Sequence, residues 1–303
     1  MSRILEPGEI ESAIAAPFLR LPERRVFEER AARFEELAPG NTLGDYLVFL
    51  ARLARAQQQA LNVFPEVALP GEEELRRSLE YRMPPLGVHG WRRDPGWQQA
   101  LAQILAAFEV EALPPPAAAA IARLSRSGAD ELEKLAEALL AGDFAGIDRA
   151  GAVFVAAALQ VYWTHMALTL RAGDAGRLEQ PNLCPVCGSL PVASIVRVGG
   201  AEEGLRYLSC SLCSAEWNMV RIKCTHCDAA KGPEYYAIES GPEAVKAEAC
   251  NTCDSYLKIM YMGKDARVNP VADDIATMAL DLLMAENGRW RCGQNLFLLP
   301  GED

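Results

Sequence analysis

The chain has 303 residues, of which 50% are hydrophobic and 23% are charged, a composition typical of a globular protein. Its formal net charge is −11, and neither residues 1–180 nor residues 181–303 carry the basic excess that nucleic-acid binding requires, so nucleic acid is excluded as the expected partner. At the N-terminus, Glu6, Glu9 and Glu11 interrupt the apolar residues, which is unlike a secretory signal. The sequence therefore predicts a cytoplasmic protein.

Helical periodicity dominates residues 1–180. Two predicted helices each carry an apolar stripe. The first stripe consists of Leu43, Leu47, Leu50, Ala54 and Leu61, and the second of Trp97, Leu101, Ile104, Leu105 and Phe108. Asp94 and Pro95 are typical of the start of the second helix, and Ser127 to Asp130 resemble a capping box at the start of a third. Because helices with one apolar face bury it against each other, this region predicts an all-α bundle.

The most apolar segment of the chain spans residues 150–170. It contains Gln160, Thr164 and His165, and small alanines dominate its first half, which is unlike a transmembrane span. We therefore expect this segment to be the buried central helix of the bundle and expect no membrane insertion.

Short alternating runs replace the helical periodicity from Pro181 onward. One predicted strand carries Val192, Ser194, Val196 and Val198 on one face. Glycines at 199, 200 and 204 predict a turn before a second strand at 205–208, and the alternation of Trp217, Met219 and Arg221 predicts a further strand.

The end of the chain predicts one more helix. Asn269 is a favoured N-cap, Pro270 suits the first helical position, and Gly288 suits the end. Its predicted apolar side comprises Ile275, Met278, Ala279 and Leu282.

Eight of the nine cysteines form four C-x-x-C pairs. They are Cys184, Cys187, Cys210, Cys213, Cys224, Cys227, Cys250 and Cys253. Adding 40 to each of the first four positions gives the last four, so the chain contains two copies of one unit. Within each unit, two C-x-x-C turns 22 residues apart can close a tetrahedral four-sulfur cage around a metal ion.

Other readings of the cysteines are less well supported. Cys210 and Cys213 could instead pair with Cys224 and Cys227 across the unit boundary, but the repeat favours pairing within units. Thioredoxin-type dithiols would need a βαβ context, which the pattern lacks. The ninth cysteine, Cys292, is expected to be a buried free thiol.

The chemistry expected of these sites is that of a closed metal centre. His89 and His165 are expected to be structural, and His226 lies within the third C-x-x-C turn, where the four-cysteine set is complete without it. No phosphate-binding loop, nucleophile elbow or H-E-x-x-H motif is present. Four thiolates leave no open position for a substrate, so the chain is not expected to be an enzyme. Zinc and the single iron of a rubredoxin both suit such a site.

Several stretches resemble the bacterial formate dehydrogenase accessory proteins of the FdhE type. They are CPVCGSLPVASIV, GLRYLSCSLCSAEWNMVRIKCTHC, KAEACNTCDSYLKIMY, VADDIATMALDLLMAENG and, more loosely, PPLGVHGW. The resemblance implies a cytoplasmic assembly factor for respiratory formate dehydrogenases that acts on the catalytic subunit and does not itself oxidise formate. It also implies rubredoxin-like iron sites, one at Cys184, Cys187, Cys210 and Cys213, and one at Cys224, Cys227, Cys250 and Cys253.

The predicted architecture is an α+β multidomain protein. A helical bundle (1–180) precedes two tandem rubredoxin-like or zinc-ribbon-like β units (181–221 and 222–268), and a C-terminal helix and tail follow (269–303). The expected function is an accessory factor that binds the formate dehydrogenase catalytic subunit and carries two mononuclear iron sites, with zinc as the alternative metal. A rubredoxin-like electron carrier and a zinc-ribbon adaptor for nucleic acid are the alternatives, and the adaptor is disfavoured by the charge.

Overall fold

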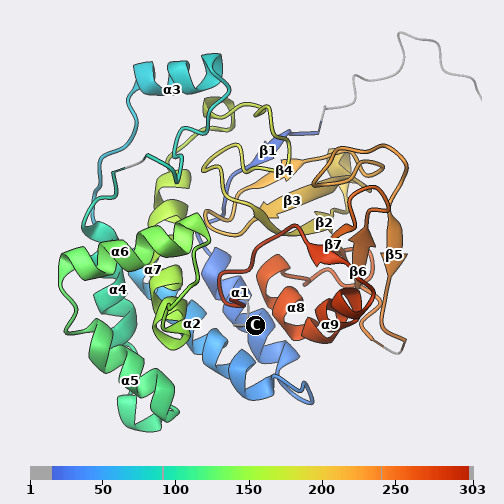
Figure 1. Ribbon diagram of the computed structural model, residues 1–303. Helices are drawn as coiled ribbons and strands as arrows, with labels where there is room; N and C mark the ends of the chain where they lie inside the picture. Colours follow the sequence, from blue (N-terminus) through green and yellow to red (C-terminus); the bar gives the residue numbers. More distant parts are fainter. Residues whose placement is uncertain (1–15, 91, 240, 300–303) are drawn as a thin grey trace, which may run out of the picture.

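The computed structural model describes residues 16–90, 92–239 and 241–299, and the N-terminal glutamates discussed above lie outside these ranges. Helices come first along the chain and strands come later, and the cysteines of the strand-rich part form two clusters (Figure 1). The predicted α+β class is therefore confirmed.

The helices before residue 180 form one packed body, apart from a helix that stands at its edge in Figure 1. They are α1 (Val26–Leu37), α2 (Gly44–Asn62), the outlying α3 (Glu72–Glu80), α4 (Gly96–Ala106), α5 (Pro115–Leu124), α6 (Ala129–Ala141) and α7 (Arg149–Ala167). The two predicted apolar stripes lie on α2 and α4. The predicted cap of α4 is displaced by one residue: the N-cap is Pro95, which has no side-chain cap. Asp94 lies just before it, and its Oδ1 accepts the N–H of Gly96 at 2.8 Å, which closes the turn that leads into the helix.

The predicted capping box at residues 127–130 is wrong. The Ser127 hydroxyl donates to the carbonyl of Arg123 at 3.3 Å, so it completes the end of α5. Helix α6 begins after Gly128 and has no side-chain cap. Ser127 lies in the short turn after α5, close enough for its hydroxyl to bond the last turn of that helix and not the first turn of α6.

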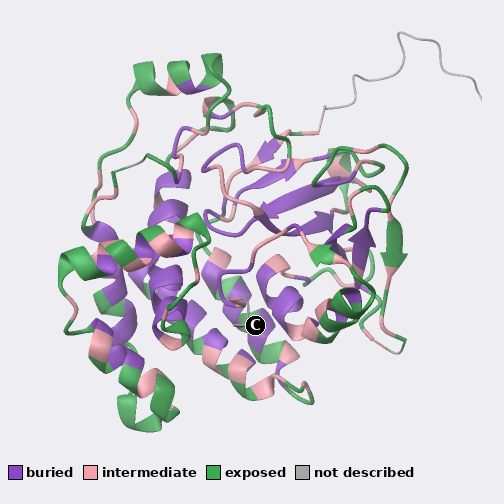
Figure 2. Cartoon of the chain, in the orientation of Figure 1, coloured by how far each residue is buried: buried purple, intermediate pink, exposed green. Residues whose placement is uncertain are grey.

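Helix α7 is the centre of the helical body, as predicted. Figure 2 shows it buried on nearly all sides, and α2, α4, α5 and α6 all pack against it. It is long and apolar enough to cross a membrane, but 83% of its most apolar stretch is buried inside the fold. It therefore has the surroundings of a core helix.

The strands join in one sheet. Those described are β1 (Leu19–Arg20), β2 (Pro191–Val196), β3 (Arg206–Cys210), β4 (Glu216–Asn218), β5 (Glu234–Tyr236), β6 (Val245–Ala249), β7 (Ser255–Tyr261) and β8 (Trp290–Arg291). Their order is β1-β4-β3-β2-β7-β6-β5, with β8 beside β7. Strands β2–β4 belong to the first cysteine unit and β5–β7 to the second. The two units meet where β2 pairs in parallel with β7.

Two strand predictions need correction. Strand β2 ends at Val196, so Val198 lies outside it and is 41% exposed, and every residue of β2 is buried. This strand has no solvent face because it lies inside the sheet and α8 (Pro270–Ala276) packs against it. Strand β4 ends at Asn218 and does not continue to Arg221, since the chain turns there toward the second unit.

The C-terminal helix begins as predicted but is broken. The Asn269 side chain accepts the N–H groups of the first turn of α8. At Thr277 the helix stops and α9 (Met278–Glu286) follows, because the buried ammonium of Lys258 binds the carbonyls of Asp274 and Thr277 at 2.7 and 3.0 Å. Because of the break, α9 buries a different face from the one predicted, and Leu282, which was expected on the apolar side, is 59% exposed.

The helical and strand-rich parts share one hydrophobic core. Buried apolar residues form a continuous cluster that extends from Leu19 to Phe297. Helix α1 packs on α8, where Arg33 and Asp273 form a buried ion pair at 2.6 Å. The first cysteine unit is thereby enclosed between the helical body and the rest of the sheet.

Candidate metal centres

The first centre consists of Cys184, Cys187, Cys210 and Cys213, all of them buried. Their Sγ atoms lie within 4.8 Å of one another. The closest pairs are Cys184 with Cys213 at 3.5 Å and Cys187 with Cys210 at 3.4 Å. These distances are far longer than a disulfide bond, so the four thiols surround a common point.

Each C-x-x-C turn of this centre is closed by backbone hydrogen bonds. The N–H of Cys184 donates to the carbonyl of Ser189, and that of Cys210 to the carbonyl of Ala215, at 2.9 and 2.8 Å. The N–H groups of Leu212 and Cys213 point at the Cys210 sulfur at 3.3 and 3.4 Å. N–H donors of this kind stabilise thiolates and hold them in the orientation that a metal requires.

The residue after each second cysteine has a positive φ. Gly188 has φ +79°, which glycine adopts without strain, as predicted. The equivalent residues Ser214, Asp228 and Asp254 have φ values of +58°, +58° and +55°. The turn geometry therefore holds at all four C-x-x-C turns, including the three without glycine.

Residues of the helical body hold the first centre in place. The N–H groups of Leu86 and Val88 donate to the carbonyls of Val186 and Cys187, each at 2.9 Å. The Gln160 side chain of α7 donates to the carbonyl of Ser211 at 2.8 Å. Both turns of the first centre are thus bonded to the helical half.

The second centre consists of Cys224, Cys227, Cys250 and Cys253. Its sulfurs also lie within 4.8 Å of one another, with Cys224 and Cys253 at 3.8 Å and Cys227 and Cys250 at 3.7 Å. The structure groups the cysteines within each 40-residue unit, not across the boundary. Unlike the first centre, this one reaches the surface, because Cys227 is exposed and Cys253 is half-buried.

The C-terminal segment supports the second centre. The Trp290 indole donates to the carbonyl of Cys253 at 2.8 Å, and Arg289 donates to the carbonyl of Cys250 at 2.8 Å. The ring of His226 packs edge-on against Trp290, with centroids 4.7 Å apart. His226 thus takes part in packing, and the four cysteines form the centre without it.

Both centres have the dimensions of a tetrahedral metal site. Four sulfurs bound to one metal at about 2.3 Å lie about 3.8 Å apart. The closest pairs span 3.4–3.5 Å in the first centre and 3.7–3.8 Å in the second. Both four-cysteine sites can hold a metal ion, and four thiols would fill its coordination shell.

Burial makes the charged form of these thiols unfavourable without a cation. In the first centre, burial raises the pKa of Cys184 and Cys213 well above the usual value for a thiol. In the second, burial also acts to raise the pKa of Cys250, but the N–H groups of Thr252 and Cys253 outweigh it and lower that pKa to about 6. A divalent or trivalent metal would supply the positive charge that four thiolates need.

Several supporting residues were not identified from the sequence. Gln160 stands out in the sequence as a polar residue in the most apolar segment, but nothing local indicates its partner Ser211. Arg289 and Trp290 lie far along the chain from the cysteines that they support, and no local pattern marks them. Cys292 is buried as expected, and its thiol donates to the carbonyl of Tyr256 at 3.3 Å. His165 packs against Phe64, and His89 is exposed, next to Val88, whose N–H bonds the carbonyl of Cys187.

Comparison with known proteins gives matches along nearly the whole chain. Three family models match, described as FdhE, N-terminal (residues 16–179), FdhE, central domain (183–221) and FdhE, C-terminal domain (222–298). A protein FdhE homolog of Edwardsiella ictaluri is 45% identical over 95% of this chain and 92% of its own length. One from Cronobacter sakazakii is 41% identical over 98% of this chain and 96% of its own. The crystal structure of the FdhE protein from Pseudomonas aeruginosa, 40% identical, superposes with a TM-score of 0.85 over 94% of this chain and all of that one.

Proposed function

The chain belongs to the FdhE family, and on that basis we propose that it is an accessory factor for a respiratory formate dehydrogenase. In this proposal it binds the catalytic subunit in the cytoplasm and is needed for that enzyme's activity. The observation that carries the proposal is the pair of four-cysteine centres within a chain related to FdhE proteins over nearly its full length.

The proposal assigns one mononuclear metal to each centre, with the eight paired cysteines as ligands. We propose iron, with zinc as the alternative. Cysteine occupies all four tetrahedral positions in each centre, so no position remains for a substrate. This supports a role in binding and assembly, and we propose that the protein is not an enzyme.

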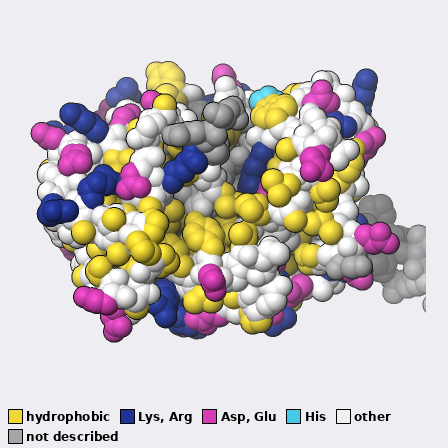
Figure 3. All heavy atoms as spheres, turned by 60° about the horizontal axis from the view of Figure 1, so that its bottom comes forward, with side chains coloured by type: hydrophobic (Ala, Val, Ile, Leu, Met, Phe, Trp, Pro, Cys, Tyr) yellow, Lys and Arg dark blue, Asp and Glu magenta, His cyan; other side chains and the backbone are white. Residues whose placement is uncertain are grey.

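An apolar face of the molecule supports a role in binding another protein. Figure 3 shows apolar side chains gathered around a hollow on the side that lies at the bottom of Figure 1, with basic side chains at the rim of the hollow and other charged residues around it. Helices α2 and α9 lie on this side and carry the exposed residues Val48, Leu282 and Leu283. Apolar patches of this kind are typical of protein–protein contact sites.

The decisive experiment is a pull-down with tagged protein from its native cells, without oxygen. We expect the formate dehydrogenase catalytic subunit to be enriched, and we expect formate dehydrogenase activity to disappear when the gene is deleted and to return with a plasmid copy. A matched pull-down with the tag alone is the control. Full activity in the deletion strain would sink the proposal.

Exposure of the second centre favours one alternative, a rubredoxin-like electron carrier. Cys227 is exposed, and an electron can reach a metal near the surface more easily than a buried one. Protein purified without oxygen would then be red and would bleach reversibly on reduction. A colourless, zinc-filled native protein would exclude this alternative and leave the accessory role intact.

The division of the chain into four units belongs to the same proposal. We propose that residues 1–180 act as the helical unit, 181–221 and 222–268 as the two metal-binding units, and 269–303 as the C-terminal helix and tail. Limited proteolysis of the metal-loaded and chelated protein tests this division, since removal of the metals should expose cleavage sites within 181–268 first.

A further inference from the structure

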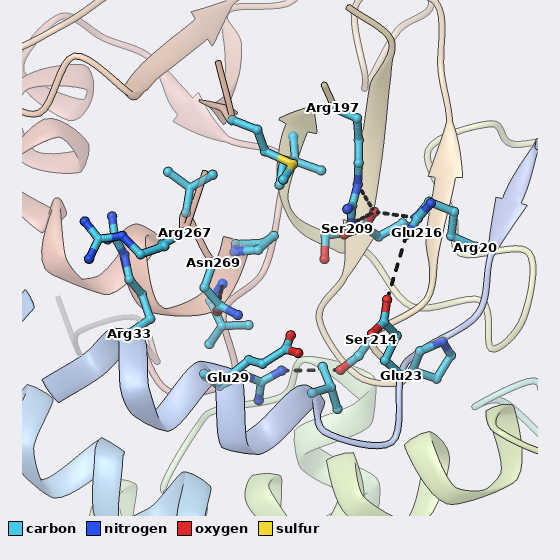
Figure 4. A pocket seen from close by; sticks show the side chains of 18 of the residues that line it. Arg20, Glu23, Glu29, Arg33, Arg197, Ser209, Ser214, Glu216, Arg267 and Asn269 are labelled. Atoms are coloured by element: carbon cyan, nitrogen blue, oxygen red, sulfur yellow. Dashed lines mark hydrogen bonds and ion pairs between the residues drawn. The ribbon is translucent and has the colours of Figure 1, made fainter. Parts of the chain in front are cut away.

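A cavity of about 600 Å³ lies beside the first four-cysteine centre, since Ser209 and Ser214, which adjoin Cys210 and Cys213 in the chain, line it. Helix α1, strands β2–β4 and the segment 262–271 form its walls (Figure 4). Five arginines and four glutamates line it, in a chain whose net charge is −11. Cavities of this size are large enough to hold a small molecule or a short stretch of another chain.

One lining residue, Arg30, is a buried cation that forms no ion pair with any of the described residues. It is 2% exposed, and its guanidinium donates only to neutral groups, the side-chain oxygens of Gln160 at 2.8 Å and Ser214 at 3.3 Å. Its Nε has no hydrogen-bond partner among the described residues. Burial lowers its pKa to about 9, and no carboxylate of the described residues forms an ion pair that would offset this.

The other arginines of this cavity differ from Arg30. Arg197 pairs with Glu216 at 2.6 Å, and Arg33 pairs with Asp273 at 2.6 Å. Arg20 and Arg267 also form ion pairs, at 2.5 and 2.6 Å. Arg30 is therefore the lining arginine that meets no carboxylate in the described part of the chain, and its guanidinium has only the ring of Phe27, 5.0 Å away, as an electrostatic partner there. An unpaired buried charge is costly to stability, and such costs are typical of sites that are kept for binding.

We propose that this cavity binds a carboxylate group at Arg30. The planar guanidinium matches the two oxygens of a carboxylate, and ionic hydrogen bonds of this kind are among the strongest in proteins. The hydroxyls of Ser209 and Ser214 line the same cavity and can donate to the same group. The bound carboxylate supplies the counter-charge that Arg30 lacks.

The cavity is much larger than one carboxylate, so the group belongs to a larger ligand. Glu29 also lines it, and no described residue forms an ion pair with Glu29 (Figure 4). The pKa of Glu29 is raised, mainly by burial and next by the nearby charge of Glu23. A cation beside Glu29 would therefore stabilise its ionised form. The occupant that satisfies both ends is a peptide segment with adjacent acidic and basic side chains. Assigning that segment to the partner protein rests on the proposed function.

Calorimetry with short peptides tests the binding site in the metal-loaded, full-length protein. The probes are acetyl-Glu-Lys-amide, its neutral counterpart acetyl-Gln-Lys-amide, and sodium acetate. We expect the Glu peptide to bind at least tenfold more tightly than the Gln peptide. Absence of binding by both the Glu peptide and acetate would overturn the proposal. Acetate binding as tightly as the peptide would overturn the assignment to a chain segment, in favour of a free small acid.

Two variants of Arg30 separate a binding role from a structural one. Arg30→Met keeps the length of the side chain and removes the charge, so we expect binding of the Glu peptide to weaken at least tenfold while Tm stays the same or rises. Arg30→Lys keeps the charge without the planar fork and should bind with intermediate affinity. Unchanged peptide binding by Arg30→Met would refute the role of Arg30.

The partner assignment has its own readout. With Arg30→Met as bait, we expect the catalytic subunit to be recovered at a lower level than with the wild-type chain. Equal recovery by both would remove the partner from this cavity and leave the proposed function standing. If the wild-type chain captures no catalytic subunit, the proposed function fails, and the peptide titration still decides whether the carboxylate site exists.

Discussion

The two cysteine centres are built from the same 40-residue unit, yet they occupy different surroundings. The first is buried on every side, and both of its turns are bonded to the helical body through Leu86, Val88 and Gln160. The second exposes Cys227, and its support comes from a short C-terminal segment and from Arg206 of the first unit, which donates to the carbonyl of Lys223. The comparison teaches that the local sequence forms the cage, while the rest of the fold determines how accessible it is.

The strands of the two units show the same contrast. Strand β2 lies inside the sheet with all its residues buried, whereas its counterpart β5 forms the edge and is largely exposed. The third strand of each unit gains a neighbour from an earlier part of the chain, β1 beside β4 and β2 beside β7. The first unit is therefore integrated into the core, and the second extends it. The predictions below test this asymmetry.

The largest effect is expected from removing ligands. Cys184→Ser with Cys187→Ser should lose one metal and lower stability by several kcal/mol, on the order of the metal's own binding free energy. The helical body should loosen as well, since it shares a core with this unit. Elemental analysis and far-ultraviolet circular dichroism during heating measure both effects.

The matched variant is Cys224→Ser with Cys227→Ser, at the equivalent positions of the second unit. It should also lose one metal but keep the helical signal and most of the Tm. Retention of two metals by either variant would contradict the ligand assignment. Equal loss of Tm in both would contradict the asymmetry between the centres.

Metal release should also differ between the centres. A chelator in excess should remove one metal per chain faster than the other by about tenfold or more, because reaching buried thiolates requires local opening that costs at least about 1.4 kcal/mol. The fast phase should be missing from the variant that lacks Cys224 and Cys227. A single phase for both metals in the wild-type chain would show that exposure of Cys227 has no kinetic consequence.

A smaller loss of stability is expected from Gln160→Leu. The change removes the donor to the Ser211 carbonyl and an acceptor of Arg30, so it leaves buried polar groups unsatisfied. We expect a loss of about 2–4 kcal/mol in the free energy of unfolding, measured by urea titration. Gln59→Leu on exposed α2 surface is the control and should change it by less than about 0.5 kcal/mol. Similar values for both would show that Gln160 does not hold the first centre.

The smallest effect compares two tryptophans that each donate to a carbonyl beside a centre. Trp290→Phe removes the bond to Cys253 at the exposed centre and should cost about 0.5–1 kcal/mol. Trp217→Phe removes the hydrogen bond from a buried indole to the carbonyl of Pro181, beside the first centre. The free energy of unfolding should fall by about 1–3 kcal/mol, because the Pro181 carbonyl left without a donor has less access to water. Thermal unfolding of the two variants ranks them, and the reverse order would contradict the comparison.

Much of the fold followed from local pattern. The stripes on α2 and α4 and the Asn269 cap depend on neighbours a few residues away, and the sequence shows these directly. The capping box at Ser127 and the unbroken final helix were wrong for one reason. In each case a hydrogen bond to a group outside the predicted motif decided the local structure. The Ser127 hydroxyl binds a carbonyl of α5 and not an N–H of α6, and the ammonium of Lys258, from a strand, binds the carbonyl of Asp274 at the helix break.

The sequence by itself determined the two cages, because the spacing within each unit and the 40-residue repeat are written in the chain. Only the tertiary structure decided that one cage is buried and the other exposed, and that Arg30 and Gln160 lie beside the first. Burial and side-chain contacts between distant segments depend on how helices and sheet pack together. That packing is settled by the summed burial of apolar surface over the whole chain, which no short pattern encodes.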